Sequence, residues 1–229
     1  MKRFHLAVMF GLVALSSLPA KAATLVPIPN AMAGLTQDVH TNNAGSGPLL
    51  TLITLPGNYL VDVSTTIGSI DVGAGNGFAQ VTGPTGPNSG FTNLTVASKS
   101  PLLGFSAAHF KIEALSTIGR NGSPARDFDL LVNFLGGGTQ VFSNVILPAN
   151  DKFLLTATGT EVITGFTFSD ARLANGNSTR FRSLKQLSFN AVLAGNAVPE
   201  PGAWALMLAG FALAGAAMRR RVSNPIVLA

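Results

Sequence analysis

The sequence predicts a mainly β protein, an antiparallel β-sandwich or jelly-roll-like domain with one apolar helix at each end of the chain. Three observations support this fold class. Apolar and polar residues alternate through the central part, which places them on opposite faces of strands. Clusters of glycine, proline and asparagine separate the alternating stretches, as turns do. The central part lacks a long helical periodicity, which favours short antiparallel strands joined by turns.

Residues 1–22 have the layout of a secretory signal peptide. A basic start is followed by an apolar stretch at residues 6–15, which is too short to cross a membrane comfortably. Residues 20–22 then fit the A-x-A pattern that signal peptidase cuts. The sequence therefore predicts a signal-peptide helix and a mature chain that begins directly after it. The cleavage residues are Ala20, Ala22 and Ala23.

Residues 23–194 are predicted to form the secreted β-sandwich domain. In the stretch FDLLVNFL, the four apolar side chains of Phe128, Leu130, Val132 and Phe134 share one strand face. The stretches NYLVDVS, FKIEA and KQLSFNAVL alternate in the same way. Twelve phenylalanines lie between residues 23 and 197, and we expect them to supply much of the core.

The charges of this central part cancel. Nine lysines and arginines between residues 23 and 197 are matched by nine acidic residues, so the net charge of +5 comes from the two ends of the chain. A nucleic-acid-binding surface would need clustered basic residues in the folded part, so nucleic acid is not expected as a partner. The absence of cysteine excludes disulfides, zinc–thiolate sites and thiol nucleophiles.

The C-terminal region, residues 195–221, combines a linker, a Pro-Glu-Pro triplet, an uncharged stretch and three arginines, and residues 222–229 form a short tail. As a helix, residues 203–218 would be about 24 Å long, somewhat shorter than the about 30 Å hydrocarbon core of a bilayer. Local thinning of the bilayer or snorkelling arginines would close this gap. We expect a single transmembrane helix in the inner membrane, with the arginines in the cytoplasm and the β-domain outside it.

The order of Pro-Glu-Pro, Trp-Ala, an apolar stretch and an arginine cluster resembles the PEP-CTERM sorting signal, in its PEPxxWA variant. The same signal is also known as the C-terminal domain of ice-binding proteins. The resemblance implies a Gram-negative envelope, recognition by the membrane protease-transpeptidase exosortase, and an association with exopolysaccharide. By this resemblance, the sorting motif consists of Pro199, Glu200, Pro201, Trp204, Arg219, Arg220 and Arg221.

The sequence assigns no catalytic residue, metal ligand or cofactor. His40 and His109 are the histidines of the mature chain, and no G-x-S-x-G elbow accompanies them, so His109 is expected to be a partly buried or surface residue more than a catalytic base. Asp127 and Asp129 offer oxygen ligands for calcium, but their alternation with apolar residues also fits a wet strand face.

Two surface hypotheses remain open. Thr156, Thr158 and Thr160 would form a row on one strand face, as an ice-matching surface does, although threonine is also an ordinary strand residue. A modest basic cluster that could meet an acidic polysaccharide, or simply face solvent, consists of Arg172, Arg180, Arg182 and Lys185.

We therefore expect a non-enzymatic protein of the envelope or extracellular matrix in a Gram-negative bacterium. Its processing partners would be signal peptidase and exosortase. It would be held transiently at the inner membrane through residues 203–218 and end at the cell surface or outside the cell. The alternatives are a carbohydrate-binding module for exopolysaccharide and a permanently membrane-anchored surface domain. A secreted hydrolase has the least support.

Overall fold

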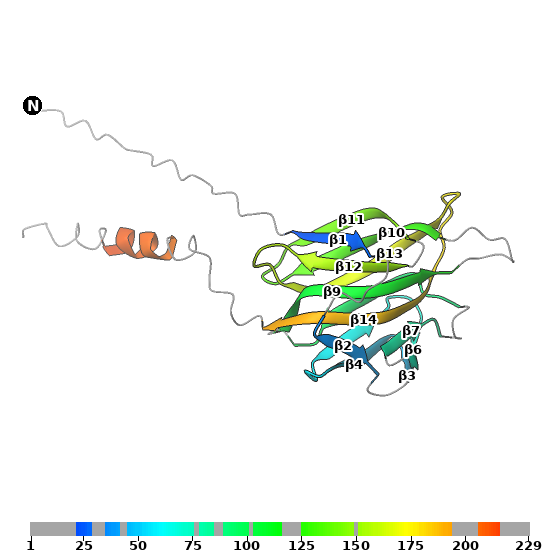
Figure 1. Ribbon diagram of the computed structural model, residues 1–229. Helices are drawn as coiled ribbons and strands as arrows, with labels where there is room; N and C mark the ends of the chain where they lie inside the picture. The colour runs from blue at the N-terminus through cyan, green and yellow to red at the C-terminus, as the bar shows by residue number, and fades with distance from the viewer. Residues whose placement is uncertain are drawn as a thin grey trace, which may run out of the picture.

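The computed structural model describes residues 22–28, 35–41, 45–75, 78–84, 89–100, 103–115, 125–148, 151–193 and 206–215. Within these ranges the chain forms antiparallel strands from Ala23 to Leu193 and a helix at residues 206–215 (Figure 1). The strands are β1 Ala23–Pro27, β2 Gln37–His40, β3 Gly45–Gly47, β4 Leu49–Leu55, β5 Leu60–Ser64, β6 Ile70–Gly75, β7 Phe78–Thr82, β8 Leu94–Ser98, β9 Leu103–Ala114, β10 Ala125–Phe134, β11 Thr139–Ile146, β12 Lys152–Ala157, β13 Ile163–Leu173 and β14 Phe181–Leu193.

Seven of these strands close into an antiparallel barrel, in the order β9–β13–β8–β5–β4–β2–β14, with β14 pairing back to β9. At two places in this barrel, few residue pairs join neighbouring strands. The β9–β13 contact consists of the single pair Phe105 and Ile163, and the β2–β14 contact consists of two residue pairs. The β9–β14 ladder runs along nearly the whole length of both strands and is the main seam of the barrel.

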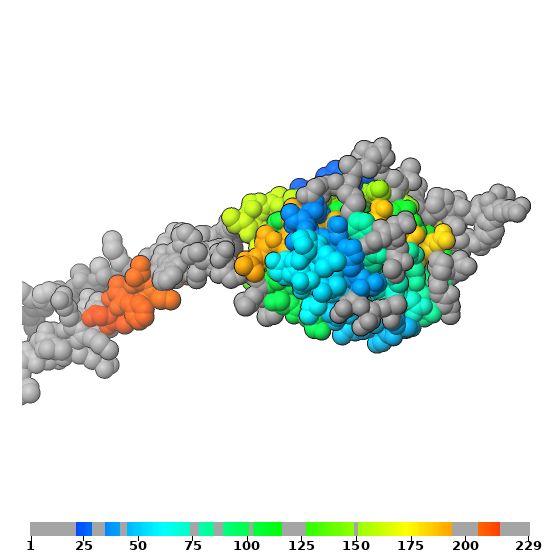
Figure 2. All heavy atoms as spheres, turned by 60° about the horizontal axis from the view of Figure 1, so that its bottom comes forward, coloured from blue at the N-terminus to red at the C-terminus, as the bar shows by residue number. Residues whose placement is uncertain are grey.

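Three extensions continue the sheet beyond the ring. β10 and β11 extend it from β13, β12 and β1 extend it from β9, and β7, β6 and β3 extend it from β14. Figure 2 shows β2, β4 and β5, coloured blue to cyan, together on one face of the molecule. β1 begins and β14 ends at the same end of the barrel (Figure 1).

The prediction of an antiparallel, mainly β domain is confirmed, but the strands close into a barrel where the sequence predicted a two-sheet sandwich or jelly roll. The physical reason lies in the long strands β9, β13 and β14, which change partners along their length. Asp170 and Gln186 adopt positive φ angles of 51° at irregularities of β13 and β14. Such bulges bend a strand and let it serve two parts of a curved sheet.

Phenylalanine rings fill the barrel core, as the sequence predicted. The predicted apolar face of β10 is buried from Phe128 to Phe134. The ring of Phe110 packs against Phe153, Phe166 and Phe168 with centroid distances of 5.8, 5.5 and 5.0 Å. These edge-to-face and offset contacts are the favoured arrangements of aromatic pairs, so they orient the strands as well as bury area.

The predicted terminal segments fall largely outside the described residues. These include the signal peptide up to residue 21 and the parts of the predicted span at 203–205 and 216–218. Leu206, Phe211 and Leu213 of the described helix are more than two thirds exposed, at 71%, 71% and 72%. Among the helical residues that the structure describes, no helix is long and apolar enough to cross a membrane.

Candidate functional site

A row of three lysines crosses the outer face of the barrel. Lys152 of β12 lies opposite Lys111 of β9, and Lys111 lies opposite Lys185 of β14. All three face away from the core, because the neighbouring residues Phe110 and Phe153 point inward. Like charges directly opposite each other on adjacent strands are destabilising without a counter-charge.

Glu113 supplies that counter-charge. Lys111 Nζ lies 2.7 Å from Glu113 Oε1, and Lys185 Nζ donates to Oε2 at 2.9 Å. Ser183 Oγ also donates to Oε2, at 2.8 Å. Burial raises the pKa of Glu113, but the hydrogen bonds from the two lysines and the serine outweigh it and lower the pKa to about 2. The carboxylate therefore stays ionised and binds two of the three lysines, Lys111 and Lys185.

Asp151 borders the same face at the start of β12. Its backbone carbonyl accepts a hydrogen bond from the Ile112 amide at 2.9 Å. Burial raises the pKa of its carboxyl; Lys111 opposes this rise and Glu113 adds to it. This face thus brings three lysines and two carboxylates close together.

His109 continues this outer face along β9 but is completely buried. Within the described parts of the chain, both ring nitrogens lack a hydrogen-bond partner, and so do Ser188 Oγ and Gln186 Oε1. Burial lowers the pKa of His109, and Lys152 lowers it further; the Gln186 backbone and Asp38 act in the opposite direction. The expectation of a partly buried or surface histidine was wrong, because His109 is fully covered by neighbouring residues.

Asp127 and Asp129 are bound by an arginine. Arg172 Nη1 donates to Asp127 Oδ1 at 3.1 Å, and Nη2 donates to Asp129 Oδ2 at 3.3 Å. Nη1 also donates to Asn144 Oδ1 at 3.0 Å. The guanidinium occupies the position that the calcium hypothesis would give to a cation. Among the residues that the structure describes, no three histidine, cysteine or acidic side chains gather as a metal site would require.

Three members of the predicted basic cluster are bound to different partners. Arg172 binds the two aspartates, Lys185 binds Glu113, and Arg180 Nη1 donates to the Ser89 carbonyl at 3.3 Å. The predicted threonine row is wrong. β12 ends at Ala157, and Thr158 donates both its N–H and its hydroxyl to the Ala22 carbonyl. Gly159 then turns the chain with a φ of +62°.

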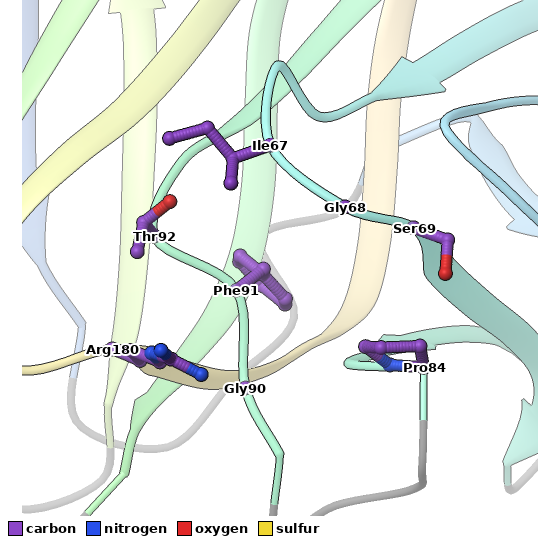
Figure 3. A pocket seen from close by; sticks show the side chains of 8 residues that line it. All are labelled: Ile67, Gly68, Ser69, Pro84, Gly90, Phe91, Thr92 and Arg180. Atoms are coloured by element: carbon purple, nitrogen blue, oxygen red, sulfur yellow. The ribbon is translucent and has the colours of Figure 1, made fainter.

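Arg180 lines a small cavity of about 150 Å³ between three connecting segments (Figure 3). Ile67, Phe91 and Pro84 provide apolar walls, and Thr92 brings a hydroxyl whose oxygen is buried without a partner among the described residues. The remaining lining residues are Gly68, Ser69 and Gly90. The cavity is large enough for ordered water or a very small polar ligand.

A larger, open cavity of about 500 Å³ lies where β14 ends. It is lined by the single tyrosine of the chain, Tyr59, beside Lys99 and Leu193. Its other lining residues are Asn58, Leu60, Ser100 and Leu103. Its volume falls in the range of small-ligand sites.

The sequence missed the lysine row and both cavities, because their residues come from segments that are far apart in the chain. Ala22 and Ala23 of the predicted cleavage site lie at the start of β1, whereas Ala20 lies outside the described residues. The predicted sorting residues Pro199, Glu200, Pro201, Trp204, Arg219, Arg220 and Arg221 also lie outside the described ranges.

No curated protein and no solved structure matches the chain at a significant level. Residues 197–221 match the family model of the PEP-CTERM protein-sorting motif. The matched range contains the Pro-Glu-Pro triplet, the apolar stretch and the three arginines. The chain therefore carries a PEP-CTERM sorting motif at its C-terminal end, which marks it as an extracellular protein sorted by an exosortase.

Proposed function

We propose that this chain is a non-enzymatic protein of the cell envelope or extracellular matrix. It is exported by its signal peptide, held transiently at the inner membrane by residues 203–218, and processed by exosortase at Pro199-Glu200-Pro201. The observation that carries the proposal is the match of residues 197–221 to the sorting motif. Release or transfer at this triplet separates the β-barrel from the apolar segment.

The barrel supports a role as a rigid, neutral module. Its central charges balance, and several acid–base groups are already engaged with one another. Glu113 is bound by two lysines, Asp127 and Asp129 share one arginine, and His109 is buried. These arrangements favour a structural or binding role over acid–base catalysis, for which a group must reach its substrate.

Replacing Pro199, Glu200 and Pro201 with alanines in the native host tests the sorting step. We expect export to continue while a longer, membrane-bound form accumulates, because the triplet is the recognised part of the signal. Fractionation with intact-mass spectrometry measures the C-terminus. Alanines at Val222, Ser223 and Asn224, just after the arginines, are the matched control and should leave processing unchanged. A wild-type protein that keeps its full C-terminus would reject the sorting proposal and favour a permanent anchor.

A second candidate function is binding of exopolysaccharide at the larger cavity. The observation that favours it is the placement of Tyr59, an aromatic platform, next to Lys99 and the side chain of Asn58. Aromatic faces stack on sugar rings, and a lysine adds attraction for acidic sugars. Binding to a glycan array, with and without EDTA, tests this function. Tyr59→Ala should abolish binding, whereas Tyr59→Phe should retain most of it.

A further inference from the structure

Strand β1 is an edge strand that begins at Ala23, the residue at which the mature chain is expected to start. It pairs with β12 alone, from Ala23 opposite Ala157 to Pro27 opposite Phe153. The Ala23 side chain is buried, with 6% exposed. Its own N–H and C=O do not bond to β12, since the Ala22 carbonyl makes that contact with Thr158.

Gln140 of β11 binds the outer side of Ala23. The Ala23 N–H donates to Gln140 Oε1 at 2.6 Å, and Gln140 Nε2 donates to the Ala23 carbonyl at 3.1 Å. The side-chain amide thus makes the two hydrogen bonds that a neighbouring strand would make. This contact links β1 with β11 across 117 residues of sequence, and the two strands lie near each other in Figure 1.

The peptide bond between Ala22 and Ala23 is engaged on both sides. The Ala22 carbonyl accepts from the Thr158 N–H at 3.0 Å and from Thr158 Oγ1 at 2.6 Å. The N–H of the same peptide donates to Gln140. A protease must bind the scissile carbonyl with its own donors. In the folded barrel those interactions are already taken, so the bond is protected.

We propose that the barrel contains a binding site for its own processed N-terminus, formed by Gln140 and Thr158, and that signal peptidase cuts the Ala22–Ala23 bond before the barrel folds. Hydrolysis adds water across this peptide bond. The carboxylate stays with Ala22 on the signal peptide, and the amine of Ala23 takes up a proton. The inference rests on the proposed function in one respect, namely export with removal of residues 1–22.

The new ammonium group suits this site. It carries three donors where the peptide had one, and Gln140 Oε1 already lies at hydrogen-bond distance from the nitrogen. Thr158 Oγ1 loses the Ala22 carbonyl on cleavage, so its oxygen is left to accept a second N–H from the ammonium. Processing therefore removes the two hydrogen bonds from Thr158 to the Ala22 carbonyl and makes the hydrogen bond from Ala23 to Gln140 a charge-assisted one that ties β1 to β11.

The reactivity of the Ala23 amine tests the site in the mature chain, residues 23–229. We expect an amine-selective acylating reagent near neutral pH to label this amine at least about tenfold more slowly in the folded protein than after unfolding, because hydrogen bonds hold the ammonium. Gln140→Leu removes the acceptor and should bring the rate close to that of the unfolded chain. Gln80→Leu, at a half-buried glutamine of β7, is the matched control and should leave the rate unchanged.

Gln140→Glu keeps an acceptor and adds a negative charge, so it should slow labelling further. If the Gln140→Leu variant does not fold, the labelling rate of Gln140→Glu still tests the binding site. Equal labelling rates in the folded and unfolded wild type, or fast labelling of folded Gln140→Glu, would overturn the proposal. Sequencing of the exported N-terminus separates the two levels, since a start other than Ala23 refutes the expected export step, whereas a reactive amine at Ala23 refutes the site alone.

The order of cleavage and folding has its own test. The full chain, folded without export, should resist purified signal peptidase, whereas the same chain diluted from denaturant into the enzyme should be cut after Ala22. The double variant Gln140→Leu and Thr158→Val should make the folded chain at least about tenfold more susceptible, because it removes the side-chain hydrogen bonds at this peptide and leaves only the one from the N–H of residue 158 to the Ala22 carbonyl. Equal cleavage of folded and unfolded wild-type chain would overturn the proposed order.

Discussion

Two ion-pair clusters on the barrel surface have opposite compositions. In one, the carboxylate of Glu113 is shared by Lys111 and Lys185; in the other, the guanidinium of Arg172 is shared by Asp127 and Asp129. The Glu113 side chain is 15% exposed, whereas that of Arg172 is 31% exposed. The hydrogen bonds to Glu113 lower its pKa to about 2. The hydrogen bonds of Arg172 to Asp129 and Asp127 raise a pKa that is already far above neutral.

The difference shows where charge matters for stability. The central group of the first cluster titrates in an accessible pH range and sits between two facing lysines. The central group of the second stays charged at any ordinary pH and is itself 31% exposed, and ion pairs of solvent-exposed groups contribute little. We therefore expect the charge-dependent part of the stability to come mainly from the first cluster, and four measurements test this difference.

The largest effect is expected for Glu113→Gln. The change leaves Lys111 and Lys185 opposite each other without a counter-charge and should lower the free energy of unfolding by about 2 kcal/mol. Urea denaturation near neutral pH measures it. Asp71→Asn, another acid-to-amide change on a strand, is the control and should stay within about 0.5 kcal/mol of the wild type. A Glu113→Gln variant as stable as this control would show that the lysine row needs no counter-charge.

Acid should remove the same contribution. The pKa of Glu113 is lowered from 4.5 to about 2 in the folded protein, so the unfolded chain binds the proton first as the pH falls. The stability from this group is complete above about pH 4.5 and is lost as the pH falls toward 2. We expect a loss of about 1–2 kcal/mol after allowing for solvent screening. The difference between wild type and Glu113→Gln should shrink over this range in denaturation curves, and a constant difference would contradict the assignment.

Asp151→Asn should act in the opposite direction and by less. Burial raises the pKa of this carboxyl, so its ionised form is unfavourable in the folded protein. Asparagine tolerates the positive φ of 57° at this position and retains the backbone carbonyl that binds Ile112. We expect a small rise in melting temperature at neutral pH that disappears in acid, where the wild-type carboxyl is protonated. A lower melting temperature at neutral pH would show that Asp151 supports the lysine row as a second counter-charge.

The smallest effect is expected for Arg172→Gln. Asp127 and Asp129 then lose their cation but remain close to water, and Asn144 N–H still donates to Asp129 Oδ1 at 2.8 Å. Near neutral pH the change in stability should be below that of Glu113→Gln, and added salt should reduce it further. Urea midpoints at low and high salt provide the measurement. An effect as large as that of Glu113→Gln would make the two clusters equivalent.

Local sequence patterns predicted where strands form but did not predict which strands pair with each other. The alternation around Phe128 placed its side chain and those of Leu130, Val132 and Phe134 on the core face, and all are buried. The same kind of pattern placed Thr156, Thr158 and Thr160 on one face, and this was wrong because β12 ends before Thr158. The two-residue alternation predicts the face on which a side chain lies only within one continuous strand.

Sequence alone was enough to establish the mainly β character of the chain, its neutral central part and the sorting motif at residues 197–221, because composition, alternation and a contiguous motif are properties of neighbouring residues. The tertiary structure alone decided the closure into a barrel, the lysine row of β12, β9 and β14, and the contact of Gln140 with Ala23. These features join residues far apart in the chain. Their positions follow from strand register and from bulges such as that at Gln186, which are settled only when all strands pack around one core.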